Sequence, residues 1–373
     1  MKGESMHEQA YRQIAENVDK NFQTAPKAGD DLSQAFIAYL KIVYTPEEAE
    51  LVQHLFMPPV FKTLEELADA TGKSADDVQN ILAPLIAKGF ILAFKDQHCI
   101  PPIPRLLNLH MFYPDINPED LEAARLYQQF FIKEKFYKYY GTSSKGTPVL
   151  RAIPIDKTIH PEEKTFSAEE AHQFILGLQT EDLQLVPCPC RTRTEKLDIR
   201  ECRDRFPIGN CIFIDGAARH FEKLGMGSRV TKGQAIQYLD DMVERGLVAT
   251  TQNHVAGRFG VMCLCCGCCC SNVRGRTVWD NPTAVLPSPF IPIAGDECVQ
   301  CETCIDRCML GALQLVEEEE KVVVDAEKCI GCGVCAIACP TEALKLHRID
   351  WPDKPFDTHV DLYITVAKDN ERL

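Results

Sequence analysis

Eight cysteines in the C-terminal part of the chain have the spacing of iron–sulfur ligands. They form two copies of the pattern C-x2-C-x2-C-x3-C, about 31 residues apart, and Pro340 follows the second copy. Three closely spaced thiolates of such a pattern wrap one four-iron cluster, and the fourth ligates the neighbouring cluster. The ligands expected for one cluster are Cys298, Cys301, Cys304 and Cys339, and those for the other are Cys329, Cys332, Cys335 and Cys308.

Two zinc sites are the alternative interpretation of these eight cysteines. Zinc sites also use four ligands, but they often include histidine and rarely repeat a run of four cysteines. The stretch resembles bacterial two-cluster ferredoxins at all eight ligand positions, although Met309 stands where a proline often follows the fourth cysteine. The resemblance implies two [4Fe-4S] clusters close enough for single electrons to pass between them.

Ten further cysteines lie between residues 188 and 270, six of them in the run CLCCGCCC. They are Cys188, Cys190, Cys202, Cys211, Cys263, Cys265, Cys266, Cys268, Cys269 and Cys270. Neighbouring side chains of an extended segment point to opposite sides, so the thiols of the run cannot all reach one iron centre. We therefore expect the run to serve two sites or one large cluster. Arg191 and Arg193 are candidate cofactor-binding residues, because their charge offsets that of a thiolate-bound cluster.

The ten thiols admit more than one use. One or two additional iron–sulfur clusters are the preferred interpretation, and a zinc site is the lesser alternative. One cluster with a reactive pair of thiols is a further alternative, as is a metal store, although metal-storage proteins lack large cores. His220 and His254 are left out of the ligand sets, because a single histidine is more often an ordinary side chain.

The middle region is similar to that of a group of anaerobe iron–sulfur proteins with no assigned activity. The shared elements are the Cys-x-Cys-Arg segment at 188–191, Cys202, Cys211, the Gly-Leu-Val helix ending at 246–248 and the run at 263–270. This resemblance spans roughly residues 150–345, including the two-cluster stretch, and it implies an architecture rather than an activity. Separately, Cys265-Cys266-Gly267 is similar to the Cys-Cys-Gly element of heterodisulfide-reductase catalytic subunits, where paired thiols hold an unusual cluster.

Composition limits the compartment and the partners. The chain has 373 residues, 45% of them hydrophobic, and a formal net charge of -14. This charge disfavours nucleic acid as the main partner. The polar N-terminus lacks the apolar stretch of a secretory signal, and no run approaches 18 apolar residues. We therefore expect a cytoplasmic protein without membrane insertion, in which clustered thiols stay reduced and bind metal rather than form disulfides.

Residues 32–105 carry the pattern of two short helices, a glycine turn and a strand. Thr63 and Glu66 form a capping box, Ser74 caps the second helix, and Gly89 ends it before an apolar strand. This pattern resembles the winged-helix domains of small bacterial regulators. The second helix begins with Asp76 and Asp77, where a DNA reader would meet base edges, so we expect partner docking or a homodimer there rather than DNA binding.

The expected fold class is α+β with several domains. A helical or partly ordered lead-in (1–31), the winged-helix-like domain (32–105) and a helical connector (106–160) precede a cysteine-rich α+β domain (161–292), a ferredoxin-like domain (293–347) and a tail (348–373). A strand is expected at VDLYITV, residues 360–366, in the tail. Neither a Walker A loop nor a dinucleotide-binding glycine motif is present, so no nucleotide or flavin is implied.

The sequence predicts an iron–sulfur protein that relays single electrons between a partner redox protein, two [4Fe-4S] clusters and a further cluster in the middle. One alternative is a catalytic reductase or reductive activator that uses the middle cluster. Another alternative is a redox-sensing winged-helix regulator. No catalytic residue is assigned, and the expected role is an electron carrier or oxidoreductase subunit rather than a stand-alone enzyme.

Overall fold

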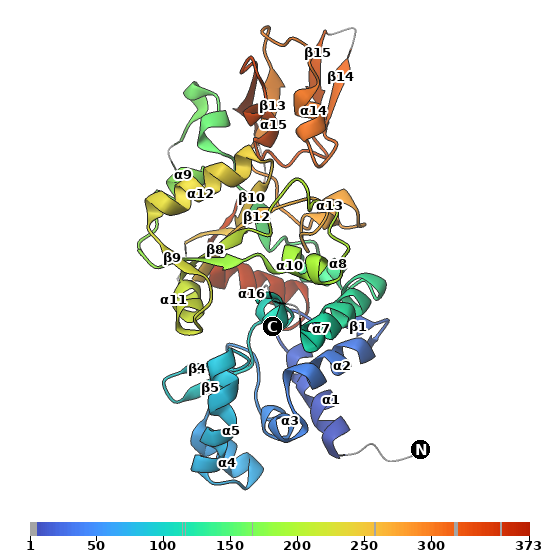
Figure 1. Cartoon of the computed structure of the whole chain (residues 1–373), viewed down its shortest axis with the longest axis vertical. Helices are drawn as coiled ribbons and strands as arrows, with labels where there is room; N and C mark the ends of the chain where they lie inside the picture. Colours follow the sequence, from blue (N-terminus) through green and yellow to red (C-terminus); the bar gives the residue numbers. More distant parts are fainter. Residues whose placement is uncertain are drawn as a thin grey trace. The chain divides into compact units, whose positions relative to one another are not determined.

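The computed structural model describes residues 6–113, 115, 117–165, 167–256, 259–316, 320–350 and 353–373 (Figure 1). The chain forms two compact units. The first contains Met1–Lys145, Thr192–Ile199 and Ile364–Leu373, and the second contains Gly146–Arg191 and Arg200–Tyr363. Among the helices of the described ranges, none combines the length and apolar character that a membrane span needs.

Helices dominate the first unit. They are α1 (Met6–Asp19), α2 (Gln34–Val43), α3 (Pro46–Val52), α4 (Leu64–Thr71), α5 (Ala75–Lys88), α6 (Ile103–Leu106), α7 (Pro118–Gln128) and α8 (Tyr137–Tyr140). A β1 (Lys27–Ala28) and β2 (Asp31–Leu32) hairpin follows α1. Aromatic side chains of the connector lie in the core, since Phe130 meets both Phe36 and Tyr39 edge to face at 5.9 Å. Edge-to-face packing of buried rings adds to the stability that their burial provides.

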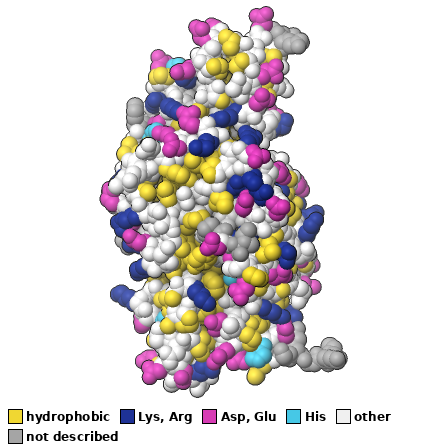
Figure 2. Space-filling view, in the orientation of Figure 1, with side chains coloured by type: hydrophobic (Ala, Val, Ile, Leu, Met, Phe, Trp, Pro, Cys, Tyr) yellow, Lys and Arg dark blue, Asp and Glu magenta, His cyan; other side chains and the backbone are white. Residues whose placement is uncertain are grey.

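The segment predicted as a helix pair is α4 and α5, and strands before and after the pair form a three-stranded sheet. Strands β3 (Lys62–Thr63), β4 (Leu92–Phe94) and β5 (Gln97–Cys99) pair in the order β3-β5-β4. The Thr63–Glu66 capping box, the Ser74 cap and the left-handed Gly89 are all confirmed. The assignment of these elements to the winged-helix family stays a prediction. Acidic and basic side chains are interspersed over the visible face in Figure 2.

The first unit contains a buried ion pair between Lys196 and Asp120. The Lys196 ammonium donates hydrogen bonds to Asp120 Oδ2 at 2.8 Å and to the backbone oxygen of Asp115 at 2.7 Å. The other oxygen of Asp120 lies 2.9 Å from His110 Nδ1. Burial raises the pKa of Asp120, but hydrogen bonds from His110 and Lys196 outweigh it, and the pKa lies below its ordinary value of 3.8. The carboxylate is therefore charged at neutral pH.

Replacing Lys196 by alanine should destabilise the first unit by about 3–5 kcal/mol, because Asp120 would stay buried without its main cation. Urea unfolding followed by fluorescence measures the change. The matched control is Lys62→Ala at the exposed Lys62–Glu66 pair, where the loss should be below about 1 kcal/mol. Because the folded pKa of Asp120 is lowered, the contribution of the buried pair should persist at neutral pH and disappear as pH falls through that folded pKa. Equal losses in both variants would contradict this assignment.

An antiparallel sheet of six strands forms the centre of the second unit. Its order is β6 (Leu150–Ala152), β10 (Val248–Gln252), β12 (Phe259–Cys265), β8 (Asn210–Asp215), β7 (Leu183–Pro187) and β9 (Ser228–Val230). Helices α9 (Ala171–Leu176), α11 (Gly216–Lys223) and α12 (Lys232–Glu244) pack on it. Thr231 caps α12 in a capping box with Gln234. Strands β11 (His254–Ala256) and β17 (Phe356–Thr358) form a separate parallel pair.

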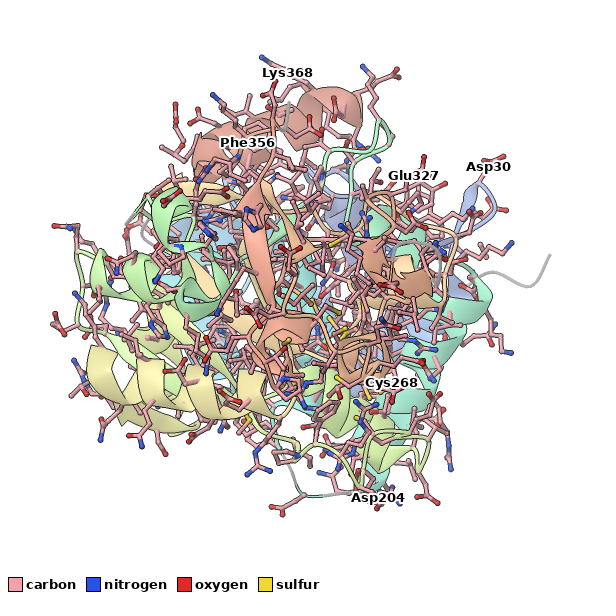
Figure 3. All side chains as sticks on the ribbon, turned by 90° about the horizontal axis from the view of Figure 1, so that it is seen from above. Asp30, Asp204, Cys268, Glu327, Phe356 and Lys368 are labelled. Carbon is pink, nitrogen blue, oxygen red and sulfur yellow. The ribbon has the colours of Figure 1, made fainter. Side chains whose placement is uncertain are left out.

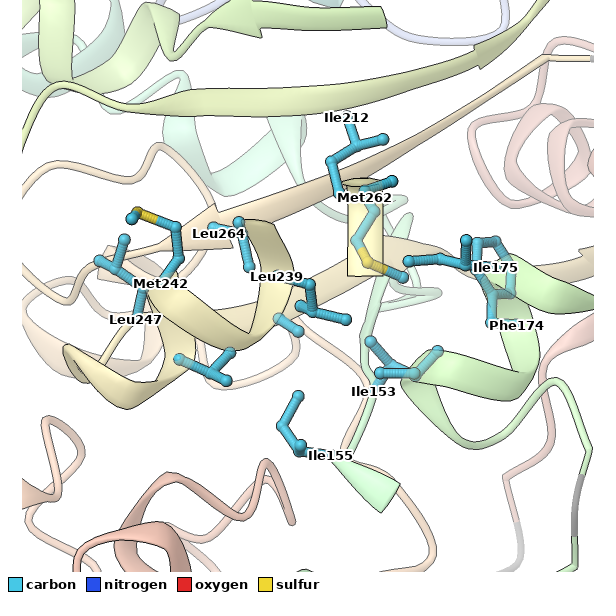
Figure 4. Close-up of a cluster of buried hydrophobic side chains, with 14 of the residues drawn as sticks. Ile153, Ile155, Phe174, Ile175, Ile212, Leu239, Met242, Leu247, Met262 and Leu264 are labelled. Carbon is cyan, nitrogen blue, oxygen red and sulfur yellow. The ribbon is translucent and has the colours of Figure 1, made fainter. Parts of the chain in front are cut away.

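One face of this sheet carries the main core of the unit (Figure 4). Met262 and Leu264 of β12 point into it together with Ile212 of β8, and Leu239 of α12 covers them. Because side chains alternate along a strand, the cysteines on either side of Leu264 must face away from this core unless the strand ends. This alternation therefore determines which face of the sheet the thiols of the cysteine run reach.

The C-terminal cysteine motifs lie in a small module with an internal repeat. Strands β13 (Phe290–Ala294) and β16 (Leu344–Arg348) pair, as do β14 (Leu313–Val316) and β15 (Lys321–Val324). Two short helices, α14 (Thr303–Arg307) and α15 (Val334–Ile337), contact each other. Strand β13 begins three residues before the predicted boundary at 293.

The predicted strand at 360–366 is wrong, because these residues lie in helix α16 (His359–Asp369). Thr358 and Asp361 exchange hydrogen bonds at its start, as in a capping box. Leu362, Val366 and Ala367 are buried. The spacing of these buried residues has a helical period, and the β-branched residues between them misled the prediction.

Candidate metal centres

The eight C-terminal cysteines line two separate cavities. One is lined by Cys298, Cys301, Cys304 and Cys339, among other residues. The second is lined by Cys308, Cys329, Cys332 and Cys335. Each cavity thus joins three cysteines of one motif to the fourth cysteine of the other. That these cysteines ligate clusters stays a prediction from their spacing.

Glycines in the left-handed conformation shape the loop around the second cavity. Gly331 has a φ of 64° and Gly333 has a φ of 79°. A side-chain carbon at Gly331 would overlap the Phe290 carbonyl and the Ser288 hydroxyl, and one at Gly333 would overlap Thr158 Oγ1. The Gly331 N–H donates to Cys329 Sγ at 3.3 Å. The loop therefore needs glycine both for its backbone conformation and for its close approach to the chain behind it.

Burial favours the protonated form of two thiols of the second cavity. It raises the pKa of Cys332 to about 12 and raises that of Cys335 further above the ordinary range. The exposed Cys301 differs, because hydrogen bonds from Thr303 lower its pKa. Thiolate is the ligating form, so metal binding at the buried thiols must release protons.

Replacing Gly331 by alanine should destabilise the module and reduce its iron content, because the new methyl group overlaps backbone and side-chain atoms. Gly311→Ala is the matched control, since Gly311 also has a positive φ but has open space around it. The control variant should lose only the stability that alanine costs in a left-handed backbone conformation, about 1–2 kcal/mol. Thermal unfolding and iron per chain measure both variants, and equal effects would show that the close approach at Gly331 is unimportant.

The ten middle cysteines divide into two groups, and all 19 cysteines of the chain are free thiols. We name the first the four-thiol group, which consists of Cys202, Cys266, Cys268 and Cys269. Its four Sγ atoms all lie within 4.8 Å of one another. The Sγ of Cys269 lies 3.8 Å from that of Cys202 and 3.5 Å from that of Cys268. Sulfur atoms near the labelled Cys268 are visible in Figure 3.

The remaining six middle cysteines form the six-thiol group. Its members are Cys188, Cys190, Cys211, Cys263, Cys265 and Cys270, and hydrogen bonds with other members shift the pKa values of five of them. Cys265 Sγ lies 3.2 Å from Cys270 Sγ. The thiols come from four places in the sequence and converge because β7, β8 and β12 are neighbours in the sheet.

Strand alternation explains this division. Cys263 pairs with Thr250 across the sheet and Cys265 pairs with Val248, so both cysteines project from the face opposite Leu264. Cys266, one residue beyond the end of β12, returns to the side of the main core, where Cys202 and Cys269 are also buried. Cys270 folds back to Cys265. Adjacent thiols of one run therefore belong to different groups.

Arg191 lies beside both groups, whereas Arg193 lies in the first unit. Burial alone would lower the pKa of Arg191, but the thiols of Cys188 and Cys266 outweigh it and raise the pKa. The Arg191 guanidinium donates to the Leu264 carbonyl at 2.7 Å. Arg193 places its guanidinium 3.9 Å from the centre of the Tyr127 ring. Its predicted role at a cluster stays a prediction.

One further group of ligand-type residues was not predicted from the sequence. His160, Glu163 and His347 place their ligand atoms within 4.8 Å of one another. His347 Nδ1 lies 3.0 Å from Glu163 Oε1, and the two imidazole rings stack at 4.8 Å. No spacing pattern connects residues so far apart in the sequence, and only the pairing of β16 with the chain near Ile159 brings them together.

Comparison with known proteins identifies the C-terminal module. The 4Fe-4S binding domain family matches residues 322–345. The polyferredoxin-like subunit of an aliphatic sulfonate oxidoreductase from Pyrococcus furiosus is 30% identical over 105 residues, which are 27% of this chain and 58% of the relative. The chain thus carries a ferredoxin-type domain of the 4Fe-4S class at its C-terminal end.

Two shorter relatives are similar over the same kind of domain. The pyruvate synthase subunit PorD from Methanothermobacter marburgensis is 38% identical over 53 residues, 14% of this chain and 59% of the relative. A ferredoxin from Rickettsia felis is 34% identical over 70 residues, 17% of this chain and 62% of the relative. The chain spans less than two thirds of the length of each of these relatives. No solved structure matches the chain.

Proposed function

Starting from a C-terminal ferredoxin-type domain, we propose that this chain is an electron-transfer protein that relays single electrons through two [4Fe-4S] clusters. A further iron–sulfur centre in the cysteine-rich middle region and a partner redox enzyme complete the path. The observation that carries this proposal is the pair of cavities, each lined by three cysteines of one motif and the fourth of the other. This arrangement matches the ligand sharing of two-cluster ferredoxins.

The cavity around Cys301 supports a role as the entry point for electrons. Cys301 is exposed, and Val299 beside it is 61% exposed. Glu297 and Glu302 flank these residues and are also exposed. An apolar residue within an acidic rim suits a partner with a basic surface, because charge complementarity speeds encounter and orients the two proteins. A polyferredoxin-like subunit among the relatives supports assembly with a redox enzyme.

The second cavity supports transfer toward the middle region. Met309, which follows the ligand-type Cys308, approaches Gly267 of the cysteine run within 3.3 Å of where a side-chain carbon would be. Ile337 of α15 packs against the core that contains Cys266 and Cys269. The cysteine run therefore contacts the ferredoxin-type domain directly, within the second unit.

We place the further electron-transfer centre at the four-thiol group. Sulfur–sulfur contacts of 3.5 to 3.9 Å are close to the edge of a sulfur tetrahedron around one ion, about 3.8 Å for bonds of about 2.3 Å. A tetrahedral set of four thiolates suits iron or zinc. One iron held by four thiolates accepts and returns one electron, whereas zinc has no redox chemistry and would make the group structural.

Iron, acid-labile sulfide and zinc per chain, measured on anaerobically purified protein, test the proposal. We expect about eight irons with sulfide from the two clusters, and one more iron without sulfide at the four-thiol group. Reduction should produce EPR signals from the two clusters. Absence of iron and sulfide would refute the proposal, whereas eight irons with zinc at the four-thiol group would confine the relay to the ferredoxin-type domain.

Replacing Cys335 by alanine should remove about four irons per chain, because one cluster would lose a ligand from its buried side. Cys99→Ala is the matched control. Cys99 is also buried, and burial raises its pKa to about 12, but it lies alone in β5. The control should keep its full iron content. An unchanged iron content in Cys335→Ala would remove this residue from the proposed ligands.

A further inference from the structure

We propose that His160, Glu163 and His347 bind one zinc ion, which keeps a coordination position open toward a neighbouring cavity. This site goes beyond the proposed relay, which uses the ferredoxin-type domain and the four-thiol group. All three residues belong to the second unit. The inference depends on how two distant segments hold these side chains together and on the cavity beside them.

Backbone and apolar contacts hold together the two segments that supply the ligands. The His160 N–H donates to the Leu346 carbonyl at 2.9 Å, and Ile159 forms a parallel bridge with Leu346. Ile159 and Leu346 are buried in one apolar cluster with Phe290. Because side chains alternate along a strand, His347 projects from the face of β16 opposite to Leu346. The buried contact therefore fixes the register that places His347 beside His160.

A short 3-10 helix, η4 (Pro161–Glu163), brings the carboxylate to the same place. The Glu163 N–H donates to the His160 carbonyl at 2.9 Å, and side chains three residues apart in such a turn lie on the same side. Glu163 Oε2 accepts a hydrogen bond from the backbone N–H of Arg348. That contact orients the carboxylate, so Oε1 lies 3.0 Å from His347 Nδ1.

The three ligand atoms are close enough to share one ion. All lie within 4.8 Å of one another. The 3.0 Å between Glu163 Oε1 and His347 Nδ1 is near the edge of a tetrahedron around zinc, about 3.3 Å for bonds of about 2.0–2.1 Å. The two imidazole rings stack with their centres 4.8 Å apart. Two histidines and one glutamate are a ligand set that zinc uses in sites with a free fourth position.

A hydrogen-bonded pair without a metal is the alternative interpretation. A hydrogen bond between Glu163 and His347 alone accounts for their 3.0 Å contact. It gives no role to the ligand atom of His160, which lies beside both. The side chains of Glu163 and His347 are 29% and 28% exposed, so an ion from solvent can reach them. Metal binding therefore explains the meeting of all three residues, and the pair explains only two.

A cavity of about 500 Å³ borders the group and is lined in part by Glu163 and Arg348. The Arg348 guanidinium donates to Glu169 Oε2 at 2.7 Å, which holds this wall of the cavity in place. Among the described residues, no fourth histidine, cysteine or carboxylate joins the three. Structural zinc sites have four protein ligands, whereas a site with three keeps a position for water or a small ligand. The cavity beside Glu163 supplies the space for that ligand.

Zinc, iron and sulfide per chain test the inference, measured after the full chain with its iron retained is incubated with zinc chloride and freed of excess metal. Wild-type protein should hold about one zinc ion more than a His160→Ala, His347→Ala double variant, while iron and sulfide stay equal. Any zinc at the cysteines is common to both proteins, so the difference reports on this group. Equal zinc contents would overturn the inference, as would the loss of iron in place of zinc.

The matched control is His172→Ala. His172 is 24% exposed and lies 2.8 Å from Asp240, but it belongs to no group of three ligand atoms within the described part of the chain. The control should keep all its zinc, and an equal loss there would also overturn the inference. Absence of iron or sulfide from the wild-type samples would count against the relay proposal alone, because this site contains neither.

Glu163→Gln tests the carboxylate with almost no change in shape, and it serves if the double variant does not fold. Loss of a ligand's hydrogen-bond partner already weakens metal binding about 10–100-fold, so loss of the ligand charge should raise the Kd for zinc by at least about tenfold. Zinc X-ray absorption of wild-type protein should show nitrogen and oxygen at about 2.0–2.2 Å that this variant loses. An unchanged Kd, or zinc surrounded only by sulfur in wild-type protein, would refute the site.

Discussion

The alternation of side chains along β12 is the constraint that determines how the middle cysteines are grouped. Cys265 projects from one face of the central sheet, and the chain turns so that Cys266 reaches the other. A run of thiols that looks like one site in sequence is therefore divided by the sheet itself. The backbone of the strand, with the Arg191 guanidinium hydrogen-bonded to Leu264, stands between the two groups. If the strand shifted by one residue, core side chains would take the positions of the sulfurs, and the sulfurs would move to the opposite face.

The same sheet links the middle region to the ferredoxin-type domain. Val248 of β10 is buried in one apolar cluster with Cys265 and also lines the second cavity. The predicted cluster ligands are thus supported by the strand that also supports the six-thiol group. A change in charge at one cavity would act on residues that are already fixed by packing, which keeps reorganisation small. This arrangement is favourable for moving electrons, because geometry that is held rigid needs little adjustment at each step.

Local features of the fold were predictable from the sequence, and long-range features were not. The capping residues Thr63 and Ser74 mark helix starts through contacts within four residues, so the sequence alone shows them. The C-terminal helix was mistaken for a strand because its β-branched residues suggest one, while its burial depends on distant partners. The repeated cysteine spacing predicted a 4Fe-4S domain, which the family match supports. The division of the middle thiols required the strand order, and the His160–His347 pair required a contact between distant segments.

The contact between Met309 and Gly267 has an evolutionary consequence. Glycine leaves room for the methionine side chain, and a methyl group at position 267 would press on both Met309 and Thr277. A chain with a larger residue at 267 would need a smaller or rigid residue at 309, such as the proline that ferredoxins often have there. The two positions should therefore vary together among descendants of a common ancestor. Joining a free-standing electron carrier to this cysteine-rich region would have required substitutions on both sides of the new contact.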